Sequence, residues 1–244
     1  MKAQNLVGGV WEDNPRANTY KTVNPVTKAS LPTNFQEATK QQIQISVNKA
    51  SEVFDLYSSI SFAERIKFLS SIKSGLLKKS EKILETFQNE SALPKSRAEG
   101  EFQRTVNQIE NFVTLLEEGS FIKPIIHTGG PDLRKMLNPI GPVAVFGASN
   151  FPLAFSTAGG DTISALAAGC PVIVKAHPYH SGTSTIVAEV INNALLNSDL
   201  PVEIFSHLGG TSHSVGSNLV SHPLIKAVGF TGSFQGGKAL YDLA

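Results

Sequence analysis

The chain has one cysteine, no long apolar run and almost no excess of charge. A single cysteine excludes an internal disulfide and agrees with a reducing compartment. No stretch approaches the roughly 18 consecutive apolar residues that suggest a membrane span. The N-terminal segment MKAQNLVGGVWEDNP also lacks the apolar region of a secretory signal. These absences predict a cytoplasmic protein.

Neither sign of charge is in large excess, because 21 Lys and Arg nearly balance 20 Asp and Glu, which leaves a net charge of +1. No electrostatic field therefore favours nucleic acid or an anionic membrane, and neither is expected as a partner. The P-loop pattern, a GxGxxG pattern after a strand and an aromatic–basic stripe are missing as well. With 244 residues, 41% of them apolar, the chain can form a large domain with a sizeable core.

The first 130 residues divide into a strand-rich opening and a helical layer. Residues 5–32 alternate loosely between apolar and polar side chains and are broken by turn residues, which predicts short strands. Apolar residues then recur three and four positions apart, and Ser61 and Glu64 have the spacing of a capping box. The pattern predicts three long helices, at about 43–57, from about 61 to near 94, and at about 102–116. Such stripes by themselves indicate core packing.

From residue 131 onward, short apolar strands alternate with helices. Strands are expected at 143–146, 172–174, 203–206 and 225–230, with a further one at 133–137, and helices at about 154–168, 182–196, 211–220 and from 234. Repeated βα units with buried strands predict a parallel, doubly wound sheet and therefore an α/β fold. Residues 131–244 are expected to form the sheet core, and residues 1–130 to add a β-hairpin and a helical layer.

The segment GPVAVFGASNFP, residues 141–152, is the most informative of the chain. Its β-branched run ends at Gly147, and a polar turn then presents Asn150 shortly before Pro152. The carboxyl ends of parallel strands are where α/β sheets bind their ligands, and the Asn150 amide is a hydrogen-bond donor. The residues alone leave two interpretations equally open: a functional donor, or a turn asparagine restrained by the proline.

Two further strand ends carry possible nucleotide-binding residues. Lys175 follows the expected strand at 172–174, and Phe230-Thr231-Gly232-Ser233 joins a strand end to the start of a helix. Backbone N–H groups at such a helix start can hold phosphate. On these residues alone, a solvated lysine and an ordinary helix cap are the more common explanations.

Together, GASNFP, LAAGCPVIVKAHP (166–178) and VGFTGS (228–233) resemble the first half of an aldehyde dehydrogenase. LVGGVW and TVNPVTKASL are similar to the opening strands of that family. Residues 132–178 most resemble the α-ketoglutaric semialdehyde (2,5-dioxovalerate) dehydrogenase subgroup, and Ser149 stands where the common family version has Trp. The resemblance implies a Rossmann-like cofactor domain without the catalytic domain, and a complete enzyme that is a homo-oligomer.

The resemblance also implies a nicotinamide cofactor, NADP or NAD. Gly232 and Ser233 then contact the pyrophosphate, Lys175 the adenosine ribose, and Gly209 the wrapped cofactor. Most NAD-preferring members have a Glu where Pro178 stands here, so a 2′-phosphate would meet no like charge. The expected cofactor-binding residues are Phe146, Gly147, Ala148, Ser149, Lys175, His177, Pro178, Gly209, Gly232 and Ser233.

In the family, a cysteine thiolate attacks an aldehyde, hydride passes to the nicotinamide, and the thioester is hydrolysed. Asn150 matches the donor that stabilises the negative oxygen. Cys170 lies before the 172–174 strand, so we expect it at the amino edge of the sheet as a buried structural thiol. The family's catalytic Cys and Glu would lie beyond this chain. We therefore expect the complete enzyme to oxidise a small aldehyde, such as an oxo-acid semialdehyde, and this chain alone to be inactive.

Two other classes of function remain open: a nucleotide-binding module or pseudoenzyme, and an inactive truncation product. A metal site is not expected, because His177 and His180 are three residues apart without further ligands nearby. A nucleophile elbow is not expected either, because Phe151 stands where that motif needs Gly.

Overall fold

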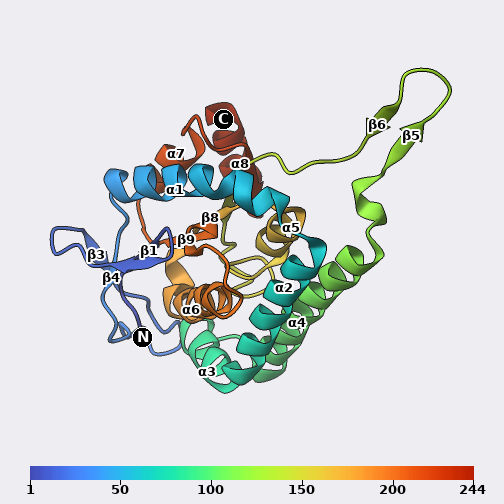
Figure 1. Cartoon of the computed structure of the whole chain (residues 1–244). Helices are drawn as coiled ribbons and strands as arrows, with labels where there is room; N and C mark the ends of the chain where they lie inside the picture. The colour runs from blue at the N-terminus through green and yellow to red at the C-terminus, as the bar shows by residue number, and fades with distance from the viewer.

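A six-stranded sheet forms the centre of the computed structural model, which describes residues 1–244 (Figure 1). Its strand order is β10-β7-β8-β9-β1-β2. The parallel strands are β7 (Val143–Phe146), β8 (Val172–Lys175), β9 (Phe205–Leu208) and β10 (Ala227–Phe230). The hairpin of β1 (Asn5–Val7) and β2 (Val10–Glu12) extends the sheet antiparallel to β9. The predicted α/β fold with a parallel sheet is confirmed.

The register brings the carboxyl ends of the four parallel strands to one edge. Phe146 of β7 pairs with Lys175 of β8 and with Phe230 of β10, and Lys175 pairs with Leu208 of β9. The loops that follow these strands therefore begin side by side. They include the predicted Asn150 and Gly232 segments, which are far apart in the sequence.

Helices cover both faces of the sheet. One face packs on α2 (Phe62–Lys78), α3 (Ser80–Ser91), α4 (Lys95–Glu118), α5 (Gly160–Ala168) and α6 (Ser181–Asn197). The other packs on α1 (Lys40–Ser59), α7 (His213–Val220) and α8 (Phe234–Leu243). Successive residues of β7 alternate between the two cores, as side chains on a strand must.

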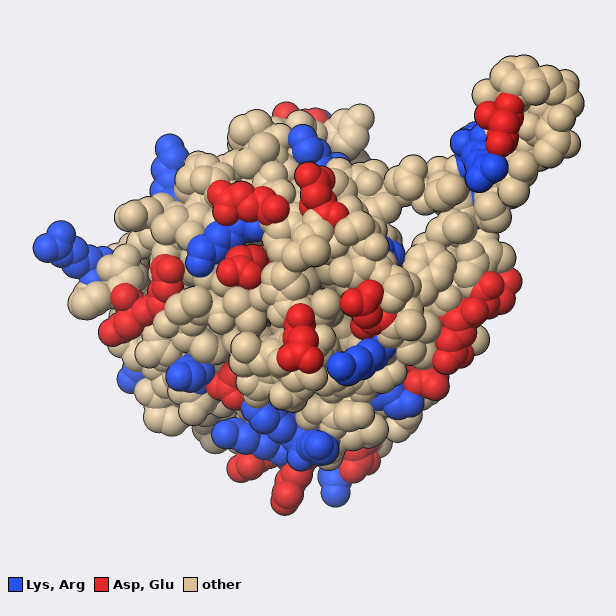
Figure 2. All heavy atoms as spheres, viewed as in Figure 1, with Lys and Arg blue, Asp and Glu red and all other residues tan.

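The remaining elements are short. They are β3 (Thr19–Tyr20), β4 (Phe35–Gln36), β5 (Ile125–His127), β6 (Leu133–Lys135) and the 3₁₀ turns η1 (Ser120–Ile122), η2 (Pro178–His180) and η3 (Val202–Ile204). The β5–β6 hairpin extends away from the body (Figure 1). Positive and negative side chains are interspersed on the face drawn in Figure 2. None of the helices is both long and apolar enough to cross a membrane.

The helix expected at about 102–116 begins earlier, at Lys95, and three other expected boundaries were also wrong. The single helix predicted from residue 61 to near 94 is divided at Lys79, whose φ of −102° and ψ of 11° end α2 before α3 begins. Apolar spacing continues across this break and does not reveal it. The helix expected from 154 begins at Gly160, since residues 148–159 form an irregular loop. The strand expected at 203–206 lies at 205–208, after the turn η3.

The predicted capping box is confirmed at the start of α2. The Ser61 hydroxyl accepts from the Glu64 N–H, and the Glu64 carboxylate accepts from the Ser61 N–H at 2.8 Å. We expect Ser61→Ala to lower the free energy of unfolding by about 1 kcal/mol, because it leaves a helix N–H without a partner. Urea denaturation measures the change. Ser74→Ala in the exposed middle of α2 is the control and should be neutral or slightly stabilising; equal losses in both variants would contradict the capping role.

Candidate functional site

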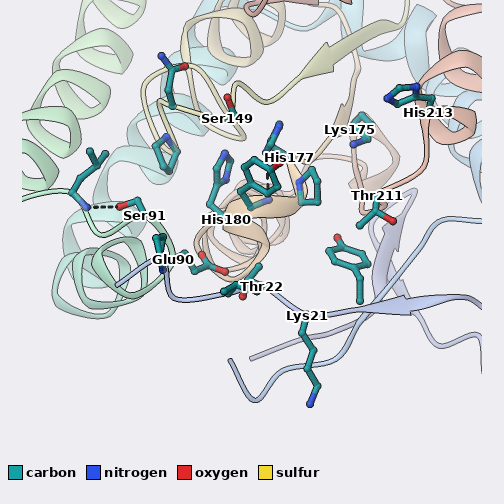
Figure 3. Close-up of a pocket in the computed structure, with 18 residues that line it drawn as sticks. Lys21, Thr22, Glu90, Ser91, Ser149, Lys175, His177, His180, Thr211 and His213 are labelled. Atoms are coloured by element: carbon teal, nitrogen blue, oxygen red, sulfur yellow. Dashed lines mark hydrogen bonds between the residues drawn. The ribbon is translucent and has the colours of Figure 1, made fainter. Parts of the chain in front are cut away.

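A cleft of about 860 Å³ opens at the carboxyl edge of the sheet (Figure 3). Its walls come from the segment after β3, the end of α3, the loop after β7 and the end of β8. Of the predicted site residues, the structure places five in this lining: Ser149, Asn150, Lys175, His177 and Pro178. The cleft joins segments that lie more than a hundred residues apart in the sequence, as the parallel sheet predicts.

Asn150 lies in an exposed turn of the loop after β7, and its neighbours fix that turn. The buried ring of His180 lies between the Ala148 carbonyl, 2.8 Å from Nε2, and the Ser184 hydroxyl, 2.9 Å from Nδ1. A carbonyl can only accept, so Nε2 carries the proton and Nδ1 accepts from Ser184. Burial lowers the pKa of His180 to about 4, which keeps the ring neutral at pH 7.

A second clamp holds the other side of the turn. The buried Glu101 carboxylate on α4 accepts from the backbone N–H groups of Leu153 at 2.8 Å and Ala154 at 3.1 Å. Burial raises the pKa of Glu101, while these two hydrogen bonds oppose the increase. The loop is therefore tied to η2 two residues before Asn150 and to α4 three and four residues after it.

Lys175 places a cation at the edge of the cleft. Its Nζ donates to the Gly210 carbonyl at 2.9 Å and forms no salt bridge. Burial lowers the pKa of Lys175 to about 8, and the negative charge of Glu37 opposes this shift. Glu37 is itself occupied, since its carboxylate accepts from the N–H and hydroxyl groups of Thr211 and Ser212.

His177 and Pro178 continue the wall of the cleft after Lys175. The His177 ring stacks on that of His180 at a centroid distance of 5.5 Å and accepts from the Tyr179 N–H. Burial, with His180 and Lys175 nearby, lowers the pKa of His177 to about 4. A neutral imidazole and a proline thus stand beside the lysine, and neither repels an anion.

The remaining predicted residues lie at the same edge but outside the cleft lining. Ser233 caps α8, and its hydroxyl accepts from the Gly236 N–H at 3.1 Å; Gly232 precedes it and is exposed. Gly209 packs closely, since a Cβ there would lie 2.8 Å from the Tyr20 hydroxyl and 3.1 Å from the Gln36 carbonyl oxygen. Phe146 and Ala148 are buried, and Gly147 donates to the Lys175 carbonyl at 3.1 Å.

Comparison with known proteins agrees with this geometry. Residues 11–244 match the sequence profile of the Aldehyde dehydrogenase family. The chain belongs to the aldehyde dehydrogenase family.

Two curated relatives are α-ketoglutaric semialdehyde dehydrogenases. The chain is 44% identical to α-ketoglutaric semialdehyde dehydrogenase 2 from Azospirillum brasilense, over 86% of this chain and 42% of the relative. It is 42% identical to the one from Acinetobacter baylyi, over 93% of this chain and 44% of the relative. The chain therefore spans less than half the length of these relatives. The resemblance to this subgroup is confirmed.

Solved structures show the same fold at lower identity. HpcC from Thermus thermophilus superposes with a TM-score of 0.90 at 21% identity, over the whole chain and 46% of that protein. A NAD-dependent benzaldehyde dehydrogenase from Corynebacterium glutamicum superposes with a TM-score of 0.86 at 22% identity, over the whole chain and 52% of that protein. The fold is that of the cofactor-binding domain of the family.

The single thiol of this aldehyde dehydrogenase chain is remote from the cleft. Cys170 is 4% exposed and lies in the core just before the amino end of β8, with its N–H donated to the Ala165 carbonyl. Asn150 follows the opposite, carboxyl end of the sheet. A thiol in this position is a packing residue, as predicted.

Sequence reasoning missed the two side chains that hold the Asn150 turn. His180 was considered only as a metal ligand, and Glu101, just before the helix expected at about 102–116, was given no role. Their hydrogen-bond partners lie 32 and 52 residues away in the sequence, and no local sequence pattern predicts contacts over such separations. The one available signal was the position of Glu101, an acidic residue within the apolar stripe of α4 between Ala98 and Phe102, which indicates a buried carboxylate with a partner.

The buried His180 should make folding sensitive to acid. An unfolded chain binds a proton at this histidine near pH 6.5, whereas the folded protein binds it only near pH 4. The free energy of unfolding should therefore fall as the pH is lowered from about 6.5 to about 4, and be independent of this group above that range. Urea denaturation at several pH values measures the slope. His180→Gln should reduce it, although His177 and His207 contribute with the same sign; an unchanged slope in the variant would refute this role.

Proposed function

We propose that this chain is the cofactor-binding part of an enzyme that oxidises an aldehyde, of the oxo-acid semialdehyde class, to the carboxylic acid. The observation that carries the proposal is Asn150, an exposed amide donor in a turn clamped on both sides at the carboxyl edge of the sheet. The identities of 42% and 44% to α-ketoglutaric semialdehyde dehydrogenases support the substrate class.

Asn150 would act on the substrate oxygen. When a nucleophile adds to an aldehyde, negative charge develops on this oxygen, and a fixed amide N–H stabilises it without reorganising. The His180 and Glu101 clamps supply the rigidity that such a donor requires. Removing one donor of this kind typically costs about a hundredfold or more in kcat.

The residues present fit a nicotinamide dinucleotide, and in this proposal residues 131–244 bind it while residues 1–130 add the β1–β2 hairpin and the helical layer. Lys175 offers a cation without a carboxylate partner, and Pro178 beside it carries no charge. Gly232 and Ser233 would lie against the pyrophosphate at the start of α8. When bound, the cofactor accepts hydride from the substrate carbon. A lysine that forms no salt bridge suits a 2′-phosphate, so we expect NADP to bind at least as well as NAD.

Cys170 has no part in this chemistry. It is buried at the amino edge, so it cannot reach an aldehyde held by Asn150. These 244 residues by themselves should therefore bind the dinucleotide without oxidising aldehydes. In the proposed enzyme the thiolate and the general base come from other residues of the assembled protein.

The role of Asn150 is testable in the intact gene product. Asn150→Ala should lower kcat by about a hundredfold or more, because the developing negative oxygen loses its donor. Steady-state kinetics with semialdehydes, with hydride transfer shown to limit the rate, measure this. Asn193→Ala on the exposed face of α6 is the control. Equal turnover in both variants would remove Asn150 from the mechanism.

The cofactor assignment is testable by calorimetric titration of this chain with NADP and NAD. Lys175→Met should weaken NADP binding by about tenfold or more, because a charge-assisted hydrogen bond of about 1.5–3 kcal/mol is lost, and should affect NAD less. Since burial lowers the pKa of Lys175 to about 8, the advantage of NADP should decline as the pH rises above that value. A clear preference for NAD that is unchanged in Lys175→Met would contradict the assignment.

A further inference from the structure

One face of α4 presents two arginines to the loop that carries Asn150. Arg97, Gly100 and Arg104 are spaced three and four residues apart and so share a helix face. Opposite them lie Phe151, the residue directly after Asn150, and Phe155. Neither the arginines nor the phenylalanines line the cleft that holds Lys175. The Asn150 turn therefore has a second, cationic side.

The arginines are held in place by aromatic rings. The guanidinium carbon of Arg97 lies 4.3 Å from the centre of the Phe151 ring, and that of Arg104 lies 4.9 Å from the centre of the Phe155 ring. The two rings pack edge to face at a centroid distance of 5.1 Å. Cation–π contacts of this kind orient a guanidinium but leave its N–H groups free to bind an anion.

Gly100 leaves open space between the two arginines. A Cβ built at this residue would meet no atom within 4 Å, so packing does not require glycine. Its φ is not in the left-handed region, and it stands inside a 24-residue helix, where Gly costs about 1 kcal/mol relative to Ala. The helix face between the two arginines is therefore open at Gly100.

The local charge favours an anion on this face. Glu101 is the one carboxylate beside both guanidiniums, and its Oε2 lies 3.6 Å from Arg97 Nη2. Its other oxygen is engaged by the loop backbone, and the next acid, Glu99, pairs with Lys95 at 3.7 Å. Arg104 forms no salt bridge and is exposed. Two arginines against one carboxylate leave a net positive charge.

We propose that Arg97 and Arg104, with the space over Gly100 between them, bind the distal carboxylate of an aldehyde whose carbonyl oxygen meets Asn150. The inference rests on the proposed function, because it is the Asn150 donor that places the reacting end. The dinucleotide cleft takes up one side of the turn, so the substrate tail leaves toward Phe151 and α4. A carboxylate there meets two planar donors suited to paired hydrogen bonds. The site selects semialdehydes over neutral aldehydes.

The first test is binding, which does not require turnover. Glutarate is titrated into the ¹⁵N-labelled chain, with 1,5-pentanediol as the uncharged control, and the amide signals of α4 are followed. Glutarate should shift the Gly100 signal and the diol should not. Arg104→Gln should weaken the response about tenfold or more, and Arg134→Gln, an exposed arginine on the β5–β6 hairpin, should leave it unchanged. No shift with glutarate, or equal shifts with the diol, overturns the proposal.

The variant Gly100→Leu distinguishes loss of binding because the site is filled from loss of binding because the protein is misfolded. Leucine is the better helix former, so the variant should be at least as stable as the wild type, yet its side chain fills the open face. Loss of glutarate binding in a variant with an unchanged or higher unfolding midpoint supports the site. Unchanged glutarate binding in Gly100→Leu contradicts it.

The second test uses the intact gene product with succinic semialdehyde and butanal. Arg104→Gln should reduce kcat/KM for the semialdehyde about tenfold or more, mainly through KM, and leave butanal unaffected. If both aldehydes lose equally, or neither does, the carboxylate site is wrong while the proposed oxidation stands. If no aldehyde is turned over and glutarate still binds through Arg104, the proposed function is wrong while the anion site stands.

Discussion

The parallel register of four strands is the constraint on which the site depends. Because β10, β7, β8 and β9 pair in step, their last residues lie in one row, and the chain must leave the sheet there four times. The Asn150 turn, Lys175 and the Ser233 cap all lie at or directly after the ends of these strands. Residues that precede a parallel strand lie at the opposite, amino edge. Cys170 precedes β8, so it lies at that edge, where it is buried in the core.

Buried side chains add to backbone hydrogen bonds, such as that from the Ala148 N–H to the Phe155 carbonyl at 2.8 Å, in holding the loop between β7 and α5. His180 and Glu101 are buried polar groups, and burying them unpaired would cost several kcal/mol. The loop supplies the Ala148 carbonyl to His180 and the Leu153 and Ala154 N–H groups to Oε1 of Glu101, while Ser184 completes His180 and Oε2 of Glu101 lies 3.6 Å from Arg97 Nη2. The loop and its two clamps therefore stabilise one another, and the exposed Asn150 between them gains a defined position without a bond of its own.

Much of this arrangement was predictable, because it follows from local patterns. Alternation of short apolar runs with helices indicated the sheet, and strand ends then placed Asn150 and Lys175 at its carboxyl edge. The irregular loop at 148–159 was not predictable, since Glu101 is a helix residue 52 positions away from the N–H group it occupies. The close packing of Gly209 against the Tyr20 hydroxyl was likewise not predictable, because Tyr20 is nearly two hundred residues away in the sequence.

Because α4 both anchors the Asn150 loop and carries the two arginines, its evolution is constrained. The same helix face carries Glu101, which anchors the loop beside Asn150, and the arginines that stack on Phe151 and Phe155. A small rotation of this helix would move the loop and both guanidiniums together. Substitutions along α4 should therefore show epistasis rather than add independently. A change at either arginine would therefore have to be compatible with the position of the loop that carries Asn150.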